Sequence, residues 1–451
     1  MKTFAYPLPG FRGYSALSNK DATQAEDIQN FTVRETSLKP RNGSAVQVGA
    51  TTAQLESLFL YRQKDSDKYF LGAEGKNLWV ANTAFSDWIT PALQTDCYNA
   101  LFCAETILDE VYMGNGSDAL CYDGTTLSDV TGSPPGFTYI RAWENRLYTN
   151  DINNPTYLRY SDIEDPAATL GDHYIQISEN TGDAVKGFIP MQSCLFILNE
   201  YSAFALYSSS SPTKVSVGPV GTISPRSIAN VNEVIYWLSH SGVCRYGGGK
   251  IYPISFDFGV FTDLVNTTYM NKAVGVAYKS CYWLAVPWGT STTNNVVLIY
   301  DTLTEQWTRL VYPFSINDFC LDGETLYAAA SDGKVYKLDY GTLDDTDQVT
   351  YSWTSDALDM KKPGMRKRVR NIAVELSEVA GGGILSLYLK EDDGLFSSPF
   401  TVDIPSGAPG KTVVVKVNTG RFYNLTAKLE TTVKAEINKI TFGGKYKPKV
   451  K

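Results

Sequence analysis

Short runs in which apolar and polar residues alternate recur along most of the chain. In the stretch 141–177, an apolar and aromatic run at 146–149 is followed by a turn-forming cluster at 151–155 and a second alternating run at 156–161. A period of two is the pattern of a strand buried on one face, and Asp, Asn and Pro are typical of turns. This stretch therefore predicts two strands joined by a turn, then a polar loop and a third strand.

Units of this kind recur about seven times between residues 51 and 342, at a spacing of about 30 to 45 residues that is typical of propeller blades. Asp-Gly turns at 123–124, 322–323 and 332–333 separate alternating runs. A single β-sandwich is the alternative, but evenly spaced units over so long a stretch fit it less well. The sequence thus predicts a β-propeller over 51–345 of about seven blades, with six as the alternative count.

The seventh unit contains only about three strands before the acidic run at 344–347 interrupts the pattern. We expect Val46, Gln47 and Val48 to supply the fourth strand, because a lone strand needs a partner and a ring closed in this way leaves no open edge. The rest of 1–50 shows little periodicity and predicts an irregular N-terminal arm.

The character of the chain changes near residue 349. Five alternating strands separated by Gly or Pro follow, which predicts a small C-terminal β-sandwich over 346–451 and makes the whole chain all-β. A basic loop precedes these five strands, and its cations are Lys361, Lys362, Arg366, Lys367, Arg368 and Arg370. We expect a solvated face or a contact with another subunit or partner there. A nucleic-acid backbone is the alternative ligand, although no aromatic residue alternates with these cations to stack on bases.

Overall charge and cysteine content narrow the class of protein. Hydrophobic residues make up 43% of the chain, which excludes general disorder, and the net charge of −8 argues weakly against tight nucleic-acid binding. The seven cysteines form no CxxC pair, so we expect buried reduced thiols rather than a zinc site. The N-terminus lacks the apolar segment of a signal peptide, and no apolar stretch is long enough to span a membrane.

No pattern of catalytic or metal-binding residues stands out. The two histidines, His173 and His240, have no third partner at ligand spacing and are expected to be structural. Neither a GxSxG nucleophile elbow nor a GxxxxGK phosphate loop occurs. The acidic runs at 162–165 and 344–347 carry oxygen ligands of the kind that calcium prefers, but their spacing favours solvated turns. We therefore expect no enzymatic activity, no cofactor and no bound metal.

Three groups of residues and one C-terminal strand carry a family resemblance. They are 10–13, 29–31 and 38–43 (LKPRNG); 143–148 (WENRLY) with 153–155, 160–162 and 165–166; 223–228 (ISPRSI) leading to 234–243; and 420–425 (GRFYNL). Together they resemble the β-propeller tail proteins of short-tailed bacteriophages, which are called tail nozzle, tail tubular or tail stabilisation proteins. The order Lys-Pro-Arg at 39–41 departs slightly from the arginine-proline order of that family.

In the nozzle family, about six subunits form a tube below the portal and adaptor, which retains viral DNA and conducts it at ejection. The resemblance therefore implies a structural virion protein of the tail, synthesised in the host cytoplasm. Its implied partners are other copies of itself in a ring-shaped oligomer, expected to be a hexamer, portal-adaptor and tail fibre proteins, and viral DNA in transient passage. An acidic protein would not grip the passing phosphates.

Two other functions stay open. A tail-tip propeller that recognises a host-surface glycan would use exposed aromatic residues near blade loops. Trp88, Trp288 and Trp307 are the candidates, although the same residues fit a blade core. A carbohydrate-active propeller would need two or three carboxylates at its central channel, and here the acidic residues fall mostly in predicted turns.

Overall fold

Extended strands make up nearly all of the regular structure, as the alternating pattern predicts. The structure is a computed structural model and describes residues 2–8, 10–15, 25–34, 36–64, 67–82, 84–132, 134–163, 165–170, 172–178, 182–208, 213–255, 258–380, 382–404 and 411–447. Within these residues the helical elements are short: α1 (Pro166–Thr169), α2 (Phe258–Leu264), and the 3₁₀ turns η1 (Pro225–Ser227) and η2 (Thr267–Lys272).

The chain divides into two units, each described by itself. Unit 1 comprises Met1–Ser44, Leu298–Val311 and Asp339–Lys451, and unit 2 comprises Ala45–Val297 and Tyr312–Leu338. Both units are therefore built from segments that lie far apart in the sequence.

Unit 2 contains a series of small antiparallel sheets, which we number as blades in chain order. Blade 1 has three strands, β7 (Ser57–Arg62), β8 (Lys68–Glu74) and β9 (Asn77–Val80).

Blades 2 to 5 have four consecutive strands each. Blade 2 is β10 (Cys103–Ile107), β11 (Glu110–Gly114), β12 (Ala119–Tyr122) and β13 (Leu127–Asp129). Blade 3 is β14 (Ile140–Trp143), β15 (Arg146–Asn150), β16 (Tyr157–Tyr160) and β17 (His173–Gln176). Blade 4 is β18 (Val185–Pro190), β19 (Leu195–Asn199), β20 (Ala203–Tyr207) and β21 (Thr213–Gly218). Blade 5 is β22 (Ala229–Val231), β23 (Val234–Ser239), β24 (Gly242–Tyr246) and β25 (Ile251–Pro253).

The last two blades differ from this pattern. Blade 6 begins with β26 (Val274–Tyr278) and β27 (Cys281–Val286) and continues into β28 (Val296–Asp301). Blade 7 is β30 (Ile316–Asp322), β31 (Thr325–Ala330), β32 (Val335–Leu338) and, from the N-terminal part of the chain, β6 (Ser44–Val48).

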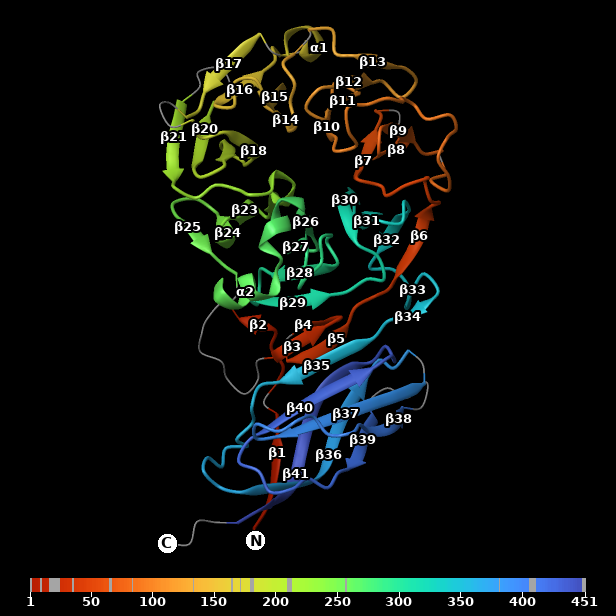
Figure 1. Ribbon diagram of the computed structural model, residues 1–451, viewed down its shortest axis with the longest axis vertical. Helices are drawn as coiled ribbons and strands as arrows, with labels where there is room; N and C mark the ends of the chain where they lie inside the picture. The colour runs from red at the N-terminus through yellow and green to blue at the C-terminus, as the bar shows by residue number, and fades with distance from the viewer. Residues whose placement is uncertain are drawn as a thin grey trace. The chain divides into compact units, whose positions relative to one another are not determined.

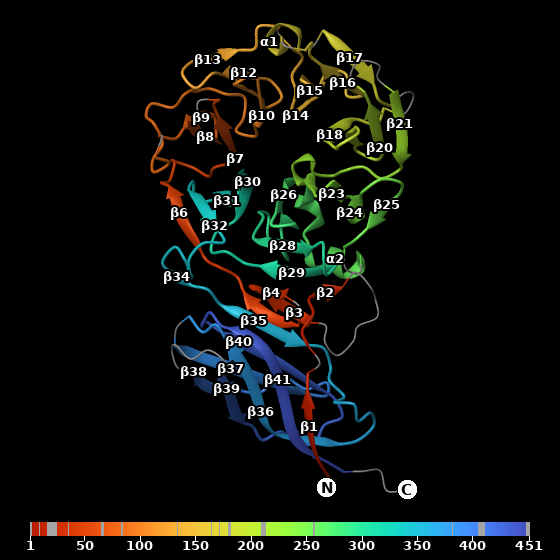
Figure 2. The same cartoon turned by 180° about the vertical axis from the view of Figure 1, so that it is seen from behind.

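The first strands of the blades form a closed ring. Each of β7, β10, β14, β18, β22, β26 and β30 contacts the next in this order, and β30 contacts β7. Figure 1 shows the blades radiating from this ring, and Figure 2 shows the same ring from behind. Unit 2 is a β-propeller, and the prediction of this fold class is confirmed.

The ring is closed by a strand from the N-terminal part of the chain. The strand β6 lies beside β32 as the fourth strand of blade 7, as expected for Val46, Gln47 and Val48. The side chain of Val48 is fully buried, in one cluster with Leu58 of blade 1 and Tyr327 of blade 7. A strand from the N-terminal part of the chain that completes the last blade removes an open sheet edge. Its buried apolar contacts also link the first blade to the last one.

The same two-residue turn recurs between the first and second strands of four blades. Both turn residues have positive φ at Leu108-Asp109, Glu144-Asn145, Asn232-Glu233 and Lys279-Ser280. A turn with two positive φ values has the twist that a tight hairpin requires. Most of these residues are not the Gly or Asn that usually mark such turns, so the repeat is more regular in the backbone than in the sequence.

Unit 1 is a β-sandwich with one continuous apolar core. One sheet has the order β39-β36-β41-β5-β4, with β1 on β41, and the other contains β29-β3-β35-β40-β37-β38, with β2 on β29. The bounds are β1 (Lys2–Pro7), β2 (Tyr14–Ser15), β3 (Ala25–Gln29), β4 (Phe31–Arg34), β5 (Ser37–Pro40), β29 (Gln306–Leu310), β33 (Leu343–Asp344), β34 (Asp347–Gln348), β35 (Tyr351–Ser355), β36 (Lys367–Ser377), β37 (Gly383–Glu391), β38 (Phe400–Ile404), β39 (Lys411–Lys416), β40 (Leu425–Thr431) and β41 (Glu436–Tyr446).

The N-terminal residues differ from the predicted arm. Strands β1, β3, β4 and β5 belong to the sheets of unit 1, where Tyr6 pairs with Phe442 and Ile28 with Trp353. These four residues lie in the same core cluster as the C-terminal strands. The strands of this segment are thus part of the sandwich. Strands β4 and β5 pair with each other, but β1 and β3 pair with strands hundreds of residues away, which explains the weak local periodicity.

A buried arginine organises this part of unit 1. The guanidinium of Arg41 donates from Nε to Asn30 Oδ1 at 2.9 Å, from Nη1 to Asn42 O at 2.8 Å and from Nη2 to Val311 O at 2.7 Å. Its two remaining donors bind both carboxylate oxygens of Asp344. All five N–H donors of the side chain are therefore used, and Arg41 and Asp344 are only 3% and 6% exposed.

Candidate functional site

A cavity of about 280 Å³ lies at the centre of the propeller and is lined by the inner strands of several blades. Its wall contains apolar residues such as Leu58 and Met113 together with four charged side chains. The four are Glu105 on β10, Arg141 on β14, Arg226 on η1 and Asp318 on β30. Ligand sites of propellers and barrels commonly lie in such central openings, so this cavity is the first candidate site.

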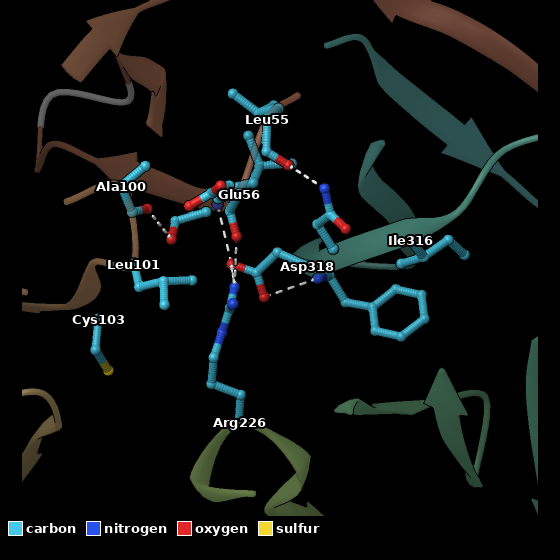
Figure 3. A network of polar contacts seen from close by, with 12 residues as sticks. Leu55, Glu56, Ala100, Leu101, Cys103, Arg226, Ile316 and Asp318 are labelled. Carbon is cyan, nitrogen blue, oxygen red and sulfur yellow. Dashed lines mark hydrogen bonds and ion pairs between the residues drawn. The ribbon is translucent and has the colours of Figure 1, made fainter. Parts of the chain in front are cut away.

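Arg226 connects three blades across one side of the cavity, as Figure 3 shows. Its Nη2 lies 2.7 Å from Asp318 Oδ2 and donates to the carbonyl of Glu56 at 2.9 Å. The same carboxylate oxygen accepts from the backbone N–H of Leu58 at 2.9 Å. Because Arg226 precedes blade 5, Asp318 belongs to blade 7 and Leu58 to blade 1, this network holds non-adjacent inner segments together.

The second charged group of the cavity surrounds Arg141. Its Nη1 lies 3.9 Å from Glu105 Oε2 and donates to Cys103 Sγ at 3.3 Å, and its Nη2 donates to the hydroxyl of Tyr139 at 3.1 Å. Burial raises the pKa of the Glu105 carboxyl, although the positive charge of Arg141 opposes the shift. Burial also raises the pKa of Tyr139 to about 12.

A carboxyl with a raised pKa is a property of general acids, but both cavity carboxylates are engaged by arginines. Glu105 faces Arg141, and Asp318 accepts hydrogen bonds from Arg226 and two backbone N–H groups. The arrangement is that of ion pairs that position inner strands. Sequence reasoning did not single out these four residues, because nothing in their local pattern indicates that they face the channel.

The predicted basic loop is brought together with cations from two other segments in unit 1. A small pocket of about 70 Å³ is lined by Arg366, Lys367, Arg368, Arg370, Arg421, Lys445, Tyr446 and Lys447. Of the predicted residues, Lys361 and Lys362 do not line it, although the ammonium of Lys362 lies 5.4 Å from the centre of the Tyr446 ring. Local sequence did not reveal Arg421, Lys445 and Lys447 as members of this group.

One member of the basic loop is buried. Lys367 donates from Nζ to the carbonyls of Lys362 and Met365, each at 3.0 Å. Burial lowers the pKa of this lysine, and the distant carboxylates of Asp359 and Asp392 oppose the shift. Lys367 therefore holds the loop in place, while Arg366 and Arg370 remain exposed.

The two histidines stack on tyrosines of the propeller. The ring of His173 lies 5.2 Å from that of Tyr160, and its Nε2 is 3.2 Å from Asp162 Oδ1. The ring of His240 lies 5.0 Å from that of Tyr201 at 15°. No group of three or more His, Cys, Asp or Glu side chains in the described residues is arranged to hold a metal ion.

The acidic runs considered as calcium ligands have other partners in the structure. Asp162 lies 3.4 Å from Arg146 Nη1 as well as near His173, whereas Glu164 lies outside the described residues. Asp344 is buried against Arg41 and also accepts a hydrogen bond from Ser44 Oγ at 3.0 Å. The acidic run at 344–347 is thus only partly a solvated turn, since Asp344 is a core residue.

The aromatic candidates for glycan binding are not exposed as that function requires. Trp307 is fully buried, and Trp88 is half-buried with its Nε1 donating to Gly49 O at 3.0 Å. Trp288 is also half-buried. Tyrosines take the exposed positions of the propeller instead, and the most exposed are Tyr98, Tyr174, Tyr201 and Tyr252.

All seven cysteines are free thiols. Five are buried, and Cys103 and Cys281 are half-buried. Burial raises the pKa of Cys97 to about 11 and that of Cys121 to about 12.

In the part of the chain that the structure describes, no helix has both the length and the hydropathy that a membrane span requires.

Comparison with known proteins extends to the fold and no further. No protein-family model and no curated protein match the chain. Similar solved structures include BamB from Moraxella catarrhalis, at 9% identity and a TM-score of 0.44 over 75% of this chain and 98% of that one. PorZ of Porphyromonas gingivalis is 10% identical, with a TM-score of 0.44 over 82% of this chain and 60% of that one. The Pan2 WD40 domain of Neurospora crassa is 7% identical, with a TM-score of 0.46 over 66% of this chain and 95% of that one.

Proposed function

We propose that this chain is a structural protein of a short bacteriophage tail, a nozzle or tail-tube component whose copies form a ring that retains DNA and conducts it at ejection. The observation that carries the proposal is the position of the stretches that resemble the nozzle family. The stretch 38–43 contains the buried Arg41, and 143–148 forms the hairpin between β14 and β15 with a fully buried Leu147. The stretches thus contribute to packing, where a shared pattern reflects a shared architecture.

The third stretch has the same character. In 223–243, the hydroxyl of Ser224 donates to Ala273 O at 2.6 Å, and that of Ser227 donates to Ser224 O at 2.6 Å. The backbone N–H of Leu238 in turn donates to Ser227 Oγ at 2.9 Å. These buried hydroxyls join η1 to blades 5 and 6, so the resemblance here also concerns residues that shape the fold.

The size of the central cavity supports a conduit between subunits rather than through one. A volume of about 280 Å³ is at the low end of the range for small-molecule pockets, about 300 to 1,000 Å³, which is far too little for a nucleic-acid strand. The Arg226 network also crosses this space. A chain of this kind conducts DNA only if several copies surround a common axis, which agrees with a ring-shaped homo-oligomer.

Electron microscopy of particles assembled without this chain tests the proposal. We expect heads that fill and then lose DNA, with truncated tails, and we expect the wild-type chain and the surface variant Lys250→Gln to restore complete particles. Full-length tails that retain DNA without this chain would overturn the proposal.

A glycan-binding tail tip is the second candidate, favoured by the exposed aromatic rings of the propeller. Tyr201 is 61% exposed and stacked on His240, and Tyr174 is 53% exposed and stacked on Tyr157 at 4.4 Å. Sugar rings commonly pack on such faces. This candidate predicts particles with intact tails and retained DNA that fail to adsorb to cells when the chain is absent.

A further inference from the structure

The basic pocket of unit 1 is formed by three segments that the sheet brings together. Strands β36 and β41 pair so that Arg368 lies directly opposite Lys445. An isolated bridge between Lys367 and Phe422 places Arg421 beside them. Apart from Tyr446, every residue that lines the pocket in the described part of the chain is Lys or Arg. The charge therefore converges through tertiary structure and not only through the basic run in the sequence.

The carboxylates of Asp359 and Asp392 act on the buried Lys367, but the exposed cations of this pocket form no ion pair in the described residues. Like charges directly opposite in neighbouring strands are destabilising, and Arg368 and Lys445 are such a pair. The ion pairs of unit 1 include those of Arg41, Arg309, Lys428 and Lys439, and none of these four residues lines the pocket. An anion bound in the pocket would remove this repulsion.

The cations are held in position before any ligand binds. Arg368 donates from Nε to Thr419 O and from Nη2 to Asn418 Oδ1, both at 2.8 Å. The guanidinium of Arg366 lies 5.4 Å from the centre of the Tyr423 ring, and its Nε donates to the Tyr423 hydroxyl at 3.3 Å. Side chains ordered in this way lose less conformational freedom on binding.

We propose that this pocket binds the phosphate groups of a nucleic-acid backbone. A pocket of about 70 Å³ is far smaller than the several hundred Å³ of an ordinary small-molecule site, which suits a single small anion such as one phosphate group. Arginine forks match phosphate oxygens in geometry and charge. The 43% exposed ring of Tyr423 beside Arg366 adds a surface on which a base stacks, and this favours a nucleic acid over an acidic peptide.

The proposal reverses the sequence-based expectation for the basic loop. Within the sequence run 361–370 no aromatic residue accompanies the cations, whereas the fold places Tyr423 and Tyr446 next to them. It also goes beyond the proposed tail function, because a conduit needs no local phosphate site. Backbone contacts carry no sequence information, so the binding is expected to be independent of base sequence and to depend strongly on salt.

Fluorescence anisotropy of the full chain with a labelled single-stranded oligonucleotide of about ten nucleotides tests the proposal. If the phosphate in the pocket and its two neighbours along the strand are engaged, the logarithm of affinity falls with the logarithm of salt at a slope of about −2, or roughly 20-fold between 50 and 200 mM. The variant Arg370→Gln/Arg421→Gln removes two exposed pocket cations and is expected to bind about tenfold more weakly, with a slope smaller by about 1.4.

A matched control is Lys250→Gln/Lys411→Gln, which removes the same charge from two exposed positions outside the pocket and is expected to bind as the wild type does. A second variant, Tyr423→Leu, is expected to weaken binding of the oligonucleotide at least about fivefold but not that of an abasic strand of equal length. This difference separates base stacking from a purely electrostatic contact.

Several outcomes would overturn the proposal. They are the absence of oligonucleotide binding, equal weakening by the pocket and control variants, and pocket-dependent binding of polyglutamate or of phosphatidylglycerol vesicles without binding of the oligonucleotide. The experiment uses purified protein and therefore does not depend on particle assembly. If the protein does not bind the oligonucleotide, only the phosphate proposal is overturned. The electron microscopy of tails tests only the tail proposal, whatever its result.

Discussion

The buried pair of Arg41 and Asp344 allows the sharpest test of how unit 1 is held together. Replacing Asp344 with alanine removes the carboxylate that pairs with the almost fully buried Arg41 guanidinium, while the hydrogen bonds of Arg41 to Asn30, Asn42 and Val311 remain. Replacing Arg41 with alanine leaves the Asp344 carboxylate with Ser44 Oγ as its remaining side-chain donor. In both variants one buried charge loses its partner.

The expected cost follows from that burial. Breaking a buried ion pair by removing one partner typically costs about 3 to 5 kcal/mol, whereas an exposed pair contributes about 1 kcal/mol or less. We expect Arg41→Ala and Asp344→Ala each to destabilise unit 1 by about 3 to 5 kcal/mol. The double variant should cost clearly less than the sum, because it leaves no unpaired charge.

Hydrogen exchange followed by mass spectrometry measures this effect in the unit where it arises. Two units need not unfold together, so a single unfolding transition of the whole chain would be hard to interpret. Protection of amides in β3–β5 and β35 should fall by about two to three and a half orders of magnitude in the single variants, while blades 2 to 5 keep theirs. Protection within one order of magnitude of wild type, or additive effects in the double variant, would refute the reasoning.

Arg62→Ala is the matched control, because Arg62 forms its ion pair with Asp322 while 48% exposed. Its loss removes one cation and one carboxylate contact, as in Arg41→Ala, but from a hydrated surface. We expect a change of at most about 1 kcal/mol, confined to blades 1 and 7.

Three further outcomes are expected. Gly43→Ala should destabilise unit 1 as measured by the same exchange experiment, because a Cβ there would clash with the carbonyl oxygen of Leu343; wild-type protection would contradict this. Burial alone would raise the pKa of Glu74, but hydrogen bonds from Ala53 N–H and the Thr52 hydroxyl lower it overall. The stability that its carboxylate contributes is therefore present at neutral pH and lost as pH falls through the depressed pKa. Glu74→Gln should cost about 1 to 3 kcal/mol at pH 7, and hydrogen exchange of the blade 1 amides at a series of pH values should show this difference shrinking below about pH 4. Finally, Cys121, with a pKa raised to about 12, should resist a thiol reagent at pH 8 in the folded chain and react at once in denaturant; rapid labelling of the folded chain would contradict its burial.

Local pattern was sufficient to predict the propeller and its closing strand. Alternation with a period of two is a property of each strand by itself, and the even spacing of the units is a property of their order along the chain. The strand at Val46, Gln47 and Val48 could be predicted because its residues alternate as in a strand. No neighbouring segment could pair with it, and the seventh unit lacked its fourth strand. The recurrent turns were less visible, since residues such as Leu108 and Lys279 adopt positive φ without the usual turn-forming identity.

Features that depend on long-range pairing were outside the reach of local pattern. The N-terminal strands join the sandwich through partners such as Phe442, and no periodicity within 1–44 indicates that partner. Trp307 shows the same limit on a smaller scale. Its alternating strand has two faces, and only the packing of unit 1 decides that this side chain is buried rather than exposed.

Net charge and local charge lead to different conclusions about DNA. A balance of −8 agrees with the proposed conduit, because a net negative surface does not hold a polyanion. The pocket lined by Arg368, Arg421 and Lys445 nevertheless concentrates positive charge at one place in unit 1. Both properties fit one task if most of the surface repels the phosphate backbone and one small site binds it reversibly. The strength of such a site falls steeply with salt, so retention of DNA by these contacts should be tight at low ionic strength and weak at high ionic strength.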